Sequence, residues 1–409
     1  MRSRQPRLWR NRPFTVFWVA QSLSYTGSQI TEFAIPLTAA LVLGADAAQM
    51  GVLGAAEMLP PLVFGVLAGA VVDRFGRASL LLWSSLGQAG VLMTIPVAAW
   101  SGLLTLPQLY VVAFVLASLA LVYGLAATAY LPILVDRRQL VQANSAMQVS
   151  DSVPSIAGPG LAGVLVQLLT APVAVAVDAI SFVVAAALLL GARRPEPSPV
   201  AAGRLGSSLR AGLAGFLERP GLWAPTAALG SHALFYGGIL ALFVLYAVRD
   251  LRLTPATLGL LYAVATLGPL LVALGAATVT RRLGFRWTAV FAAGLFGANL
   301  LIPLAGGPAW LVVLMLVVAR GLVGQGAVFL GIVRSTLLQQ TVPAELVGRV
   351  NSVVNLVEWG PLPLGSLAGG ALGQLIGLRP ALFVLAIGGL TALPWVVIPA
   401  VRGRLPNPD

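Results

Sequence analysis

Five acidic residues lie well inside the long apolar stretches of this 409-residue chain, which is 58% hydrophobic and only 9% charged. They are Glu32, Glu57, Asp151, Asp178 and Glu358. An acid is costly to keep in an apolar segment, and its presence there indicates function by default. Such a carboxyl group can carry a proton, attract a cation or form an ion pair, so these residues are the first candidates for chemistry.

The sequence offers little for other chemistries. It has no cysteine, so disulfide, iron–sulfur and zinc–thiolate chemistry is excluded, and a single histidine, His232, excludes a histidine-rich metal site. We find no Ser-His-Asp grouping and no glycine-rich phosphate loop, and therefore expect neither an enzyme nor a cofactor. The net charge of +12 comes from arginines in short loops between apolar segments, which is typical of membrane topology rather than nucleic-acid binding.

An internal repeat contains two of the acids. The stretch 144–163, NSAMQVSDSVPSIAGPGLAG, returns without a gap as 351–370, NSVVNLVEWGPLPLGSLAGG. The repeat pairs Asp151 with Glu358 and also matches an Asn-Ser pair, a proline and two glycines. A repeat whose two copies are separated by half the chain is the signature of a transporter built from two related halves.

Apolar stretches long enough to span a bilayer recur along the whole chain, and they predict twelve transmembrane helices. We expect these helices at about 14–42, 48–72, 79–100, 107–131, 141–169, 172–190, 221–248, 255–280, 286–305, 309–333, 347–376 and 380–401. The prediction is an all-α integral membrane protein with two pseudo-symmetric six-helix bundles, 1–191 and 221–409. A cytoplasmic linker at 192–220 joins them and is expected to contain a short amphipathic surface helix at Ser207–Leu217.

The distribution of arginines predicts the orientation of the chain. Most of the 25 arginines fall on the same side of the membrane as the N-terminus, and this bias places both termini in the cytoplasm. The first apolar stretch is too long for the core of a signal peptide, so we interpret it as a retained first helix. We expect a monomer in the cell membrane whose partners are the bilayer, protons and a small-molecule substrate.

The stretch 65–77, GVLAGAVVDRFGR, resembles the loop between helices 2 and 3 of the major facilitator superfamily. Its small residues would let helix 2 approach a neighbour closely, and Gly76 would permit a tight turn. A partial copy, RRLG, occurs at 281–284, where Arg281 stands in the place of Asp73. The resemblance implies the twelve-helix fold of that family.

Further motifs are similar to one part of this family. The sequence GPGLAG at 158–163 is similar to the helix 5 motif of its drug:proton antiporters, and RGLVGQG at 320–326 looks like their helix 4 motif, displaced into the second half. The blocks 143–145 and 177–182 resemble a bacterial subgroup that includes macrolide-type drug exporters and the enterobactin (siderophore) exporter. In this resemblance the antiporter-motif residues are Gly158, Pro159 and Gly163.

Helix 1 departs from the family pattern. Gly-Asp is expected there, whereas this chain has Gly27-Ser28 and places Glu32 one turn later. The resemblance implies that helix 1 lines the central cavity, so we expect Glu32 to carry the coupling proton and to attract a cationic substrate. The alternative is an acid that is hydrogen-bonded near the outer surface.

The other candidates fall into two groups, each with a structural alternative. The proton-coupling and substrate group also contains Arg320, His232, Asp178, Tyr236 and Phe235. Asp178 could instead be a satisfied structural acid and His232 a packing residue, whereas Arg320 cannot lose its proton and needs a carboxylate or an anionic substrate group as a partner.

The second group consists of expected cytoplasmic gating residues. We expect the turn that contains Asp73 to hold the cytoplasmic end of the helix expected at 347–376, near Glu358. We expect Asp151 to lie near the corresponding arginines of the second half. The alternative for Asp151 and Glu358 is direct proton coupling, and Glu57 is either a lateral or outer gate or a structural acid. The full expected gating set is Asp73, Arg74, Gly76, Arg77, Asp151, Glu358, Arg281 and Arg282.

These expectations combine into one functional hypothesis with two alternatives. The hypothesis is secondary active export of a lipophilic, cationic or amphipathic compound, driven by inward proton flow. No ATP-binding motif is present, so the drive must come from an ion gradient or from the substrate gradient. An exporter of an anionic or amphipathic metabolite, of the siderophore or lysophospholipid type, would have the same fold with a basic site at Arg320. A receptor or structural membrane protein would show no flux.

Overall fold

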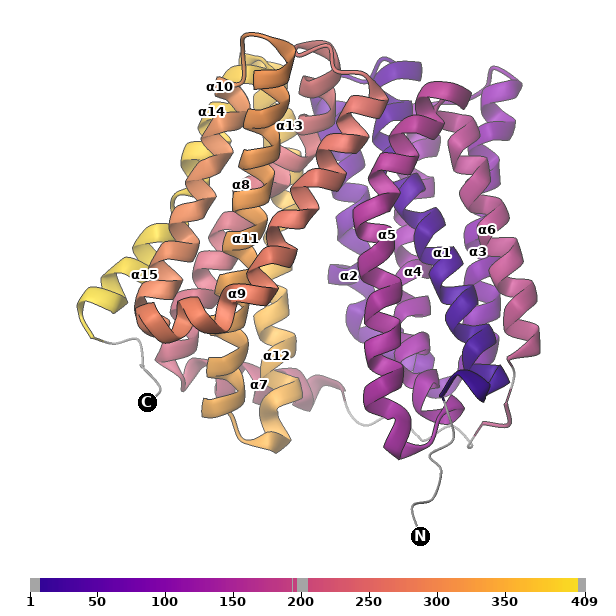
Figure 1. Ribbon diagram of the computed structural model, residues 1–409, viewed down its shortest axis with the longest axis horizontal. Coiled ribbons are helices and arrows are strands. Elements are labelled where there is room, and N and C mark those ends of the chain that lie inside the picture. Colours follow the sequence, from indigo (N-terminus) through magenta and orange to yellow (C-terminus); the bar gives the residue numbers. More distant parts are fainter. Residues whose placement is uncertain (1–7, 193, 197–204, 404–409) are drawn as a thin grey trace. The chain divides into compact units, whose positions relative to one another are not determined.

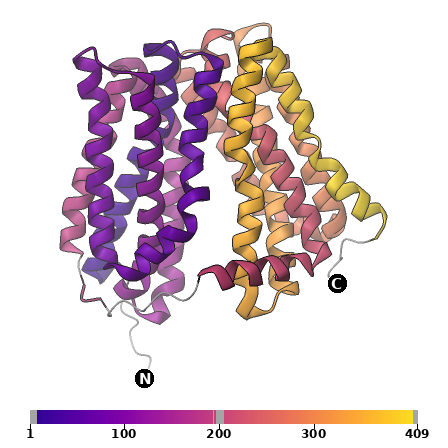
Figure 2. The same cartoon turned by 180° about the vertical axis from the view of Figure 1, so that it is seen from behind.

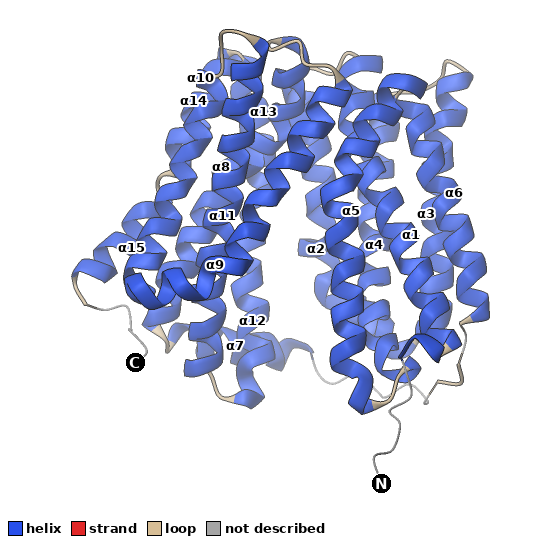
Figure 3. Ribbon diagram, viewed as in Figure 1, coloured by secondary structure: helices blue, strands red, loops and turns tan. Residues whose placement is uncertain are grey.

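The computed structural model describes residues 8–192, 194–196 and 205–403 (Figure 1). These residues form helices joined by loops, and the described part of the chain contains no strand (Figure 3). The expected all-α class is confirmed. A helix satisfies its own backbone groups, which is what a segment without access to water requires.

The helices of the first half begin and end close to their expected bounds. They are η1 (Leu8–Arg10), α1 (Arg12–Leu37), the π-helical η2 (Thr38–Val42), α2 (Ala47–Arg74), α3 (Arg77–Trp100), α4 (Leu106–Leu134), η3 (Arg137–Gln139), α5 (Leu140–Leu169) and α6 (Ala171–Gly191). Both α4 and α6 have a proline in the first turn, where its missing N–H group leaves no hydrogen bond unmade.

The second half contains more breaks than the sequence predicts. Its elements are α7 (Leu205–Leu217), α8 (Pro220–Arg249), α9 (Pro255–Leu295), η4 (Phe296–Leu300), α10 (Leu301–Leu304), α11 (Ala309–Thr341), α12 (Ala344–Trp359), α13 (Pro361–Ile376), α14 (Leu378–Gly389) and α15 (Ala392–Val401). The single helix expected at 347–376 is divided just before Pro361, which has no N–H group to continue the helix. The helix expected at 380–401 is likewise divided between α14 and α15.

Nine helices among the described residues are long and apolar enough to cross a membrane, judged by length and composition. The start of α9, Pro255–Leu270, is a shorter apolar helix. The two remaining expected spans lie on α1 and on the divided pair α12–α13. The chain is thus a multi-pass membrane protein.

The chain forms two compact units, each with its own apolar core. The first comprises Met1–Gly44, Val63–Gly203 and Thr254–Leu260, and the second comprises Ala45–Leu62, Arg204–Leu253 and Leu261–Asp409. Each unit includes the start of one helix from the other half of the sequence, namely α9 in the first unit and α2 in the second. The expected division into 1–191, a linker at 192–220 and 221–409 stays a prediction.

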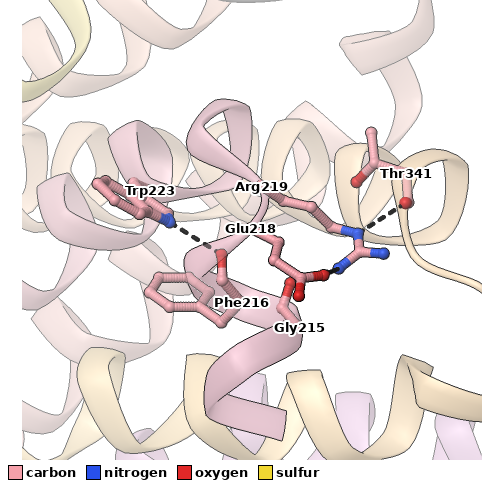
Figure 4. A network of polar contacts seen from close by, with 6 residues as sticks. All are labelled: Gly215, Phe216, Glu218, Arg219, Trp223 and Thr341. Atoms are coloured by element: carbon pink, nitrogen blue, oxygen red, sulfur yellow. Dashed lines mark hydrogen bonds and ion pairs between the residues drawn. The ribbon is translucent and has the colours of Figure 1, made fainter. Parts of the chain in front are cut away.

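A helix forms where the sequence predicts an amphipathic segment, and this helix, α7, lies across the direction of the upright helices of its unit (Figure 2). At Gly212 it approaches α12 so closely that a Cβ atom would overlap the carbonyl oxygen of Arg349. Beyond its end, Arg219 Nε donates a hydrogen bond of 2.8 Å to the carbonyl of Thr341 (Figure 4). These contacts attach α7 to the ends of α11 and α12.

Candidate functional site

A polar cavity of about 180 Å³ lies between α1, α4 and α5 within the first unit. Its polar lining consists of Gln21 and Tyr25 on α1, Thr128 on α4, and Asn144, Gln148 and Asp151 on α5. The three α5 residues are spaced four and three positions apart and therefore share one helix face. Ala127 and Leu131 supply apolar surface from α4.

Asp151 is the one charged residue in the lining of this cavity. Its Oδ1 atom is buried and makes no hydrogen bond within the described part of the chain. The amide of Gln21 is already engaged, since its Oε1 accepts a hydrogen bond of 2.8 Å from the Tyr123 hydroxyl. Because Asp151 gives the cavity lining its one formal charge, the cavity is suited to a cation or to a group that donates hydrogen bonds.

Glu32 lies on α1 outside the cavity lining, and its side chain is exposed. Its Oε2 accepts a hydrogen bond of 3.3 Å from Gln29 Nε2. The structure therefore does not bring Glu32 and Asp151 into one site, although both residues belong to the first unit.

Asp178 is buried between α1 and α6. Its two carboxylate oxygens accept hydrogen bonds from Thr31 Oγ1 at 2.5 Å and from Ser181 Oγ at 3.0 Å. A Cβ atom at Gly27 would overlap both Asp178 Oδ1 and Ser181 Oγ, so the glycine allows α1 to pack against this acid. These contacts favour the structural interpretation of Asp178.

Glu358 forms a buried ion pair that the sequence analysis did not identify. Arg334 Nε on α11 lies 2.9 Å from Glu358 Oε1 on α12, and the two side chains are 15% and 8% exposed. The N–H group does not point at the oxygen, so the contact is an ion pair rather than a directed hydrogen bond. Glu358 thus has a charge partner within its own unit, and the expected clasp with the turn at Asp73 stays a prediction.

Arg320 lies between aromatic side chains in the second unit. Its guanidinium carbon is 4.0 Å from the centre of the Tyr262 ring and 4.9 Å from the centre of the Phe243 ring. These distances are within the range of cation–π attraction. The two aromatic faces are therefore partners of the guanidinium.

His232 belongs to an aromatic cluster in the second unit. Its ring is 5% exposed, stacks on Phe296 at 3.7 Å between ring centres and lies 5.2 Å from Tyr236. Phe235 packs against Gly388, where a Cβ atom would overlap the ring. These contacts favour packing roles for all three candidates, His232, Tyr236 and Phe235.

The backbone conformation of the turn between α2 and α3 does not require a glycine. Gly76 has φ −61° and ψ 128°, which any residue adopts, so the expected conformational requirement is wrong for this position. The copy in the second half does require glycine, because Gly284 has φ 72° where it breaks α9. Asp73, Arg74, Arg281 and Arg282 are exposed in these turns, whereas Arg77 is half-buried.

Glu196 contacts the same turn and was missed by sequence reasoning. Its two carboxylate oxygens accept hydrogen bonds of 2.7 Å from the backbone N–H groups of Arg77 and Ala78. These groups lie in the first turn of α3, where N–H groups have no partner within the helix and a negative charge is favourable. Glu196 therefore caps α3 from a position 119 residues along the chain.

The antiporter-motif glycines are sites of close helix packing. A Cβ atom at Gly158 would overlap Gln29 on α1, and one at Gly163 would overlap the carbonyl oxygen of Pro255 at the start of α9. A Cβ atom at Gly259 would likewise overlap the carbonyl oxygen of Pro159. The repeat-related glycines of α13 make matching contacts with the backbones of α8 and α2.

Several cavity residues carried a signal that the sequence analysis did not use. Asn144, Gln148 and Asp151 recur at spacings of four and three and so share one face of α5, and Gln21 and Tyr25 share a face of α1 at a spacing of four. Arg334 and Glu196 had no such signal, because their partners are remote in sequence.

Comparison with known proteins shows the family. A model of the Major Facilitator Superfamily matches residues 17–358. The chain belongs to the major facilitator superfamily. It is a membrane transporter of the secondary type, which binds small-molecule substrates, and not an enzyme.

Two sequence relatives cover nearly the whole chain. The chain is 27% identical to the uncharacterized MFS-type transporter YfiS of Bacillus subtilis (strain 168) over 395 residues, which cover 92% of this chain and 91% of that protein. It is 23% identical to macrolide efflux protein A of Streptococcus pyogenes over 383 residues, which cover 91% of each.

Solved structures of transporters share the fold. A bacterial homologue of the iron transporter ferroportin, crystallised in an inward-facing state, matches with a TM-score of 0.74 at 18% identity over 97% of this chain and 99% of that one. The nucleoside transporter NupG matches with a TM-score of 0.71 at 11% identity over 94% and 98%. At these identities the likeness concerns the fold alone.

Proposed function

We propose that this protein exports lipophilic cationic small molecules by alternating access, in exchange for protons. The observation that carries the proposal is the cavity at Asp151, where one carboxylate stands among neutral polar groups inside a membrane-spanning unit. A lone negative charge in such surroundings attracts cations and repels anions. The similarity to macrolide efflux protein A supports outward transport.

We further propose that Glu32 carries the coupling proton. The Glu32 side chain is exposed on α1, whereas Asp178 and Glu358 are buried. A carboxyl group in such a position can take a proton on one side and release it on the other. The arginine distribution supports a location in the cell membrane with both termini in the cytoplasm.

One observation favours a second candidate function. Arg320 holds a permanent positive charge on α11 against the faces of Phe243 and Tyr262. A cation beside aromatic rings suits an anionic, amphipathic metabolite of the siderophore or lysophospholipid type. A receptor or structural role would predict no flux of any compound.

Transport of matched dyes by the full chain in proteoliposomes tests this proposal. Ethidium supplies a permanent cation and carboxyfluorescein an anion, with protein-free liposomes as the control. We expect protein-dependent movement of ethidium and none of carboxyfluorescein. Movement of the anion alone would favour the second function, and movement of neither dye would contradict the proposal.

A further inference from the structure

The internal repeat extends beyond the helices in which it was recognised. Continued towards the N-terminus at the same offset, it aligns Gly124-Leu-Ala-Ala-Thr128 of α4 with Gly331-Ile-Val-Arg-Ser335 of α11. The helix ends agree with this register, because α4 stops before Val135 and α11 stops before Val342, each in extended backbone. The offset that pairs Asp151 with Glu358 therefore also pairs Ala127 with Arg334.

The two halves place different side chains beside the paired acids Asp151 and Glu358. In the second half the Arg334 guanidinium lies against the Glu358 carboxylate. In the first half its counterpart Ala127 has only a methyl group, and the cavity of about 180 Å³ lies beside it and Asp151. The cavity thus occupies the place that a guanidinium fills in the related half.

Size and chemistry limit what the cavity can hold. A drug-sized ligand needs roughly 300–1,000 Å³, so the cavity accommodates only part of such a compound. The side-chain oxygens of Asn144, Gln148 and Tyr25 can accept hydrogen bonds from a donor beside the carboxylate, and no arginine or histidine contributes to the lining. A small, hydrogen-bonding cation fits this set.

We propose that the cavity binds the guanidinium or ammonium head group of the exported compound, in the way that Glu358 binds Arg334. This assignment rests on the proposed function and adds to it the position of the cationic group and its chemical class. The lipophilic part of the compound lies outside the cavity.

Binding of methylguanidinium to the full chain in lipid nanodiscs tests the assignment, with the melting temperature followed by tryptophan fluorescence. We expect methylguanidinium to raise the melting temperature of the wild type. Asp151→Asn should weaken the apparent affinity about tenfold to a hundredfold, the usual effect of a charge-assisted hydrogen bond. The matched control, Asp136→Asn, removes an exposed carboxylate at the end of α4 and should bind as the wild type does.

A second variant tests the comparison with Arg334 directly. Ala127→Arg places a tethered guanidinium beside Asp151, so the variant should no longer respond to methylguanidinium. It should also melt at a higher temperature than the double variant Ala127→Arg/Asp151→Asn. Equal responses of the wild type and Asp151→Asn would overturn the assignment, even if Ala127→Arg does not fold.

Two further outcomes separate this inference from the proposed function. If sodium chloride raises the melting temperature of the wild type but not that of Asp151→Asn, and displaces methylguanidinium, the cavity is an inorganic cation site and the assignment is overturned. If Asp151→Asn transports ethidium at the wild-type rate and binds methylguanidinium equally, the inference fails while the proposed function stands. If methylguanidinium binds through Asp151 but ethidium does not move, the site stands and the proposed function fails.

Discussion

Arg334 and Glu358 form an ion pair that should be costly to break from one side only. Removing one partner leaves a charge buried without compensation, which costs about 3–5 kcal/mol, whereas replacing both is often nearly neutral. We expect Arg334→Met to lower the free energy of unfolding by about that amount. The double variant Arg334→Met/Glu358→Gln should recover most of the loss.

Unfolding in mixed micelles, followed by circular dichroism, measures these differences. Arg349→Met is the control, because Arg349 is exposed on α12 and its loss should change little. The single variant Glu358→Gln completes the set. If the double variant loses as much stability as Arg334→Met and Glu358→Gln added together, the contact is not a coupled pair.

Gly27 is the second residue with a specific steric role. An alanine there would press its Cβ atom into the carboxylate of Asp178, and such overpacking costs about 1–3 kcal/mol. Gly90 is the matched control on α3, because an added Cβ atom would meet nothing within 4 Å. We expect Gly27→Ala to lower the melting temperature clearly and Gly90→Ala to leave it unchanged or raise it. Equal effects of the two substitutions would disprove this role for Gly27.

At the scale of the elements, the break in α9 depends on one backbone conformation. Gly284 has φ 72° and ψ 165°, a region that is almost exclusive to glycine and costs other residues about 1–3 kcal/mol. Gly284→Ala should therefore destabilise the second unit or straighten α9. Gly76→Ala, at the corresponding turn of the first half, should be tolerated, because Gly76 has a negative φ. The melting temperatures of the two variants measure this difference. A larger decrease for Gly76→Ala than for Gly284→Ala would contradict the expected role of Gly284.

The elements also show how far the sequence predicts this structure. Runs of apolar residues are local, so they predicted the positions of α1 to α6 within a few residues. The division of α12 from α13 was missed, because prolines inside other helices of this chain, such as Pro154 and Pro159 in α5, do not interrupt them. The cap from Glu196 and the pair of Arg334 with Glu358 depend on tertiary contacts that no local pattern contains.

At the scale of the whole molecule, the arginine distribution predicts which ends of the helices face the cytoplasm. The chain has no cysteine, so single cysteines can report this directly. Ser79→Cys, after the turn at the end of α2, should react with a membrane-impermeant maleimide only in inverted vesicles. Ser101→Cys, at the other end of α3, should react only in intact cells. Both residues are exposed. The reverse pattern would overturn the proposed orientation.

Inward proton flow is proposed to drive export of the cation, with Glu32 as the proton carrier. The most direct test is accumulation of ethidium against its gradient in proteoliposomes with an imposed pH gradient. We compare the wild type with Glu32→Gln, which keeps the shape of the side chain but cannot release a proton.

The wild type should accumulate the dye only while the pH gradient persists. Glu32→Gln should fold and bind the dye but fail to accumulate it. Accumulation by Glu32→Gln at the wild-type rate would show that Glu32 is not the carrier, and wild-type accumulation without a pH gradient would contradict proton coupling itself.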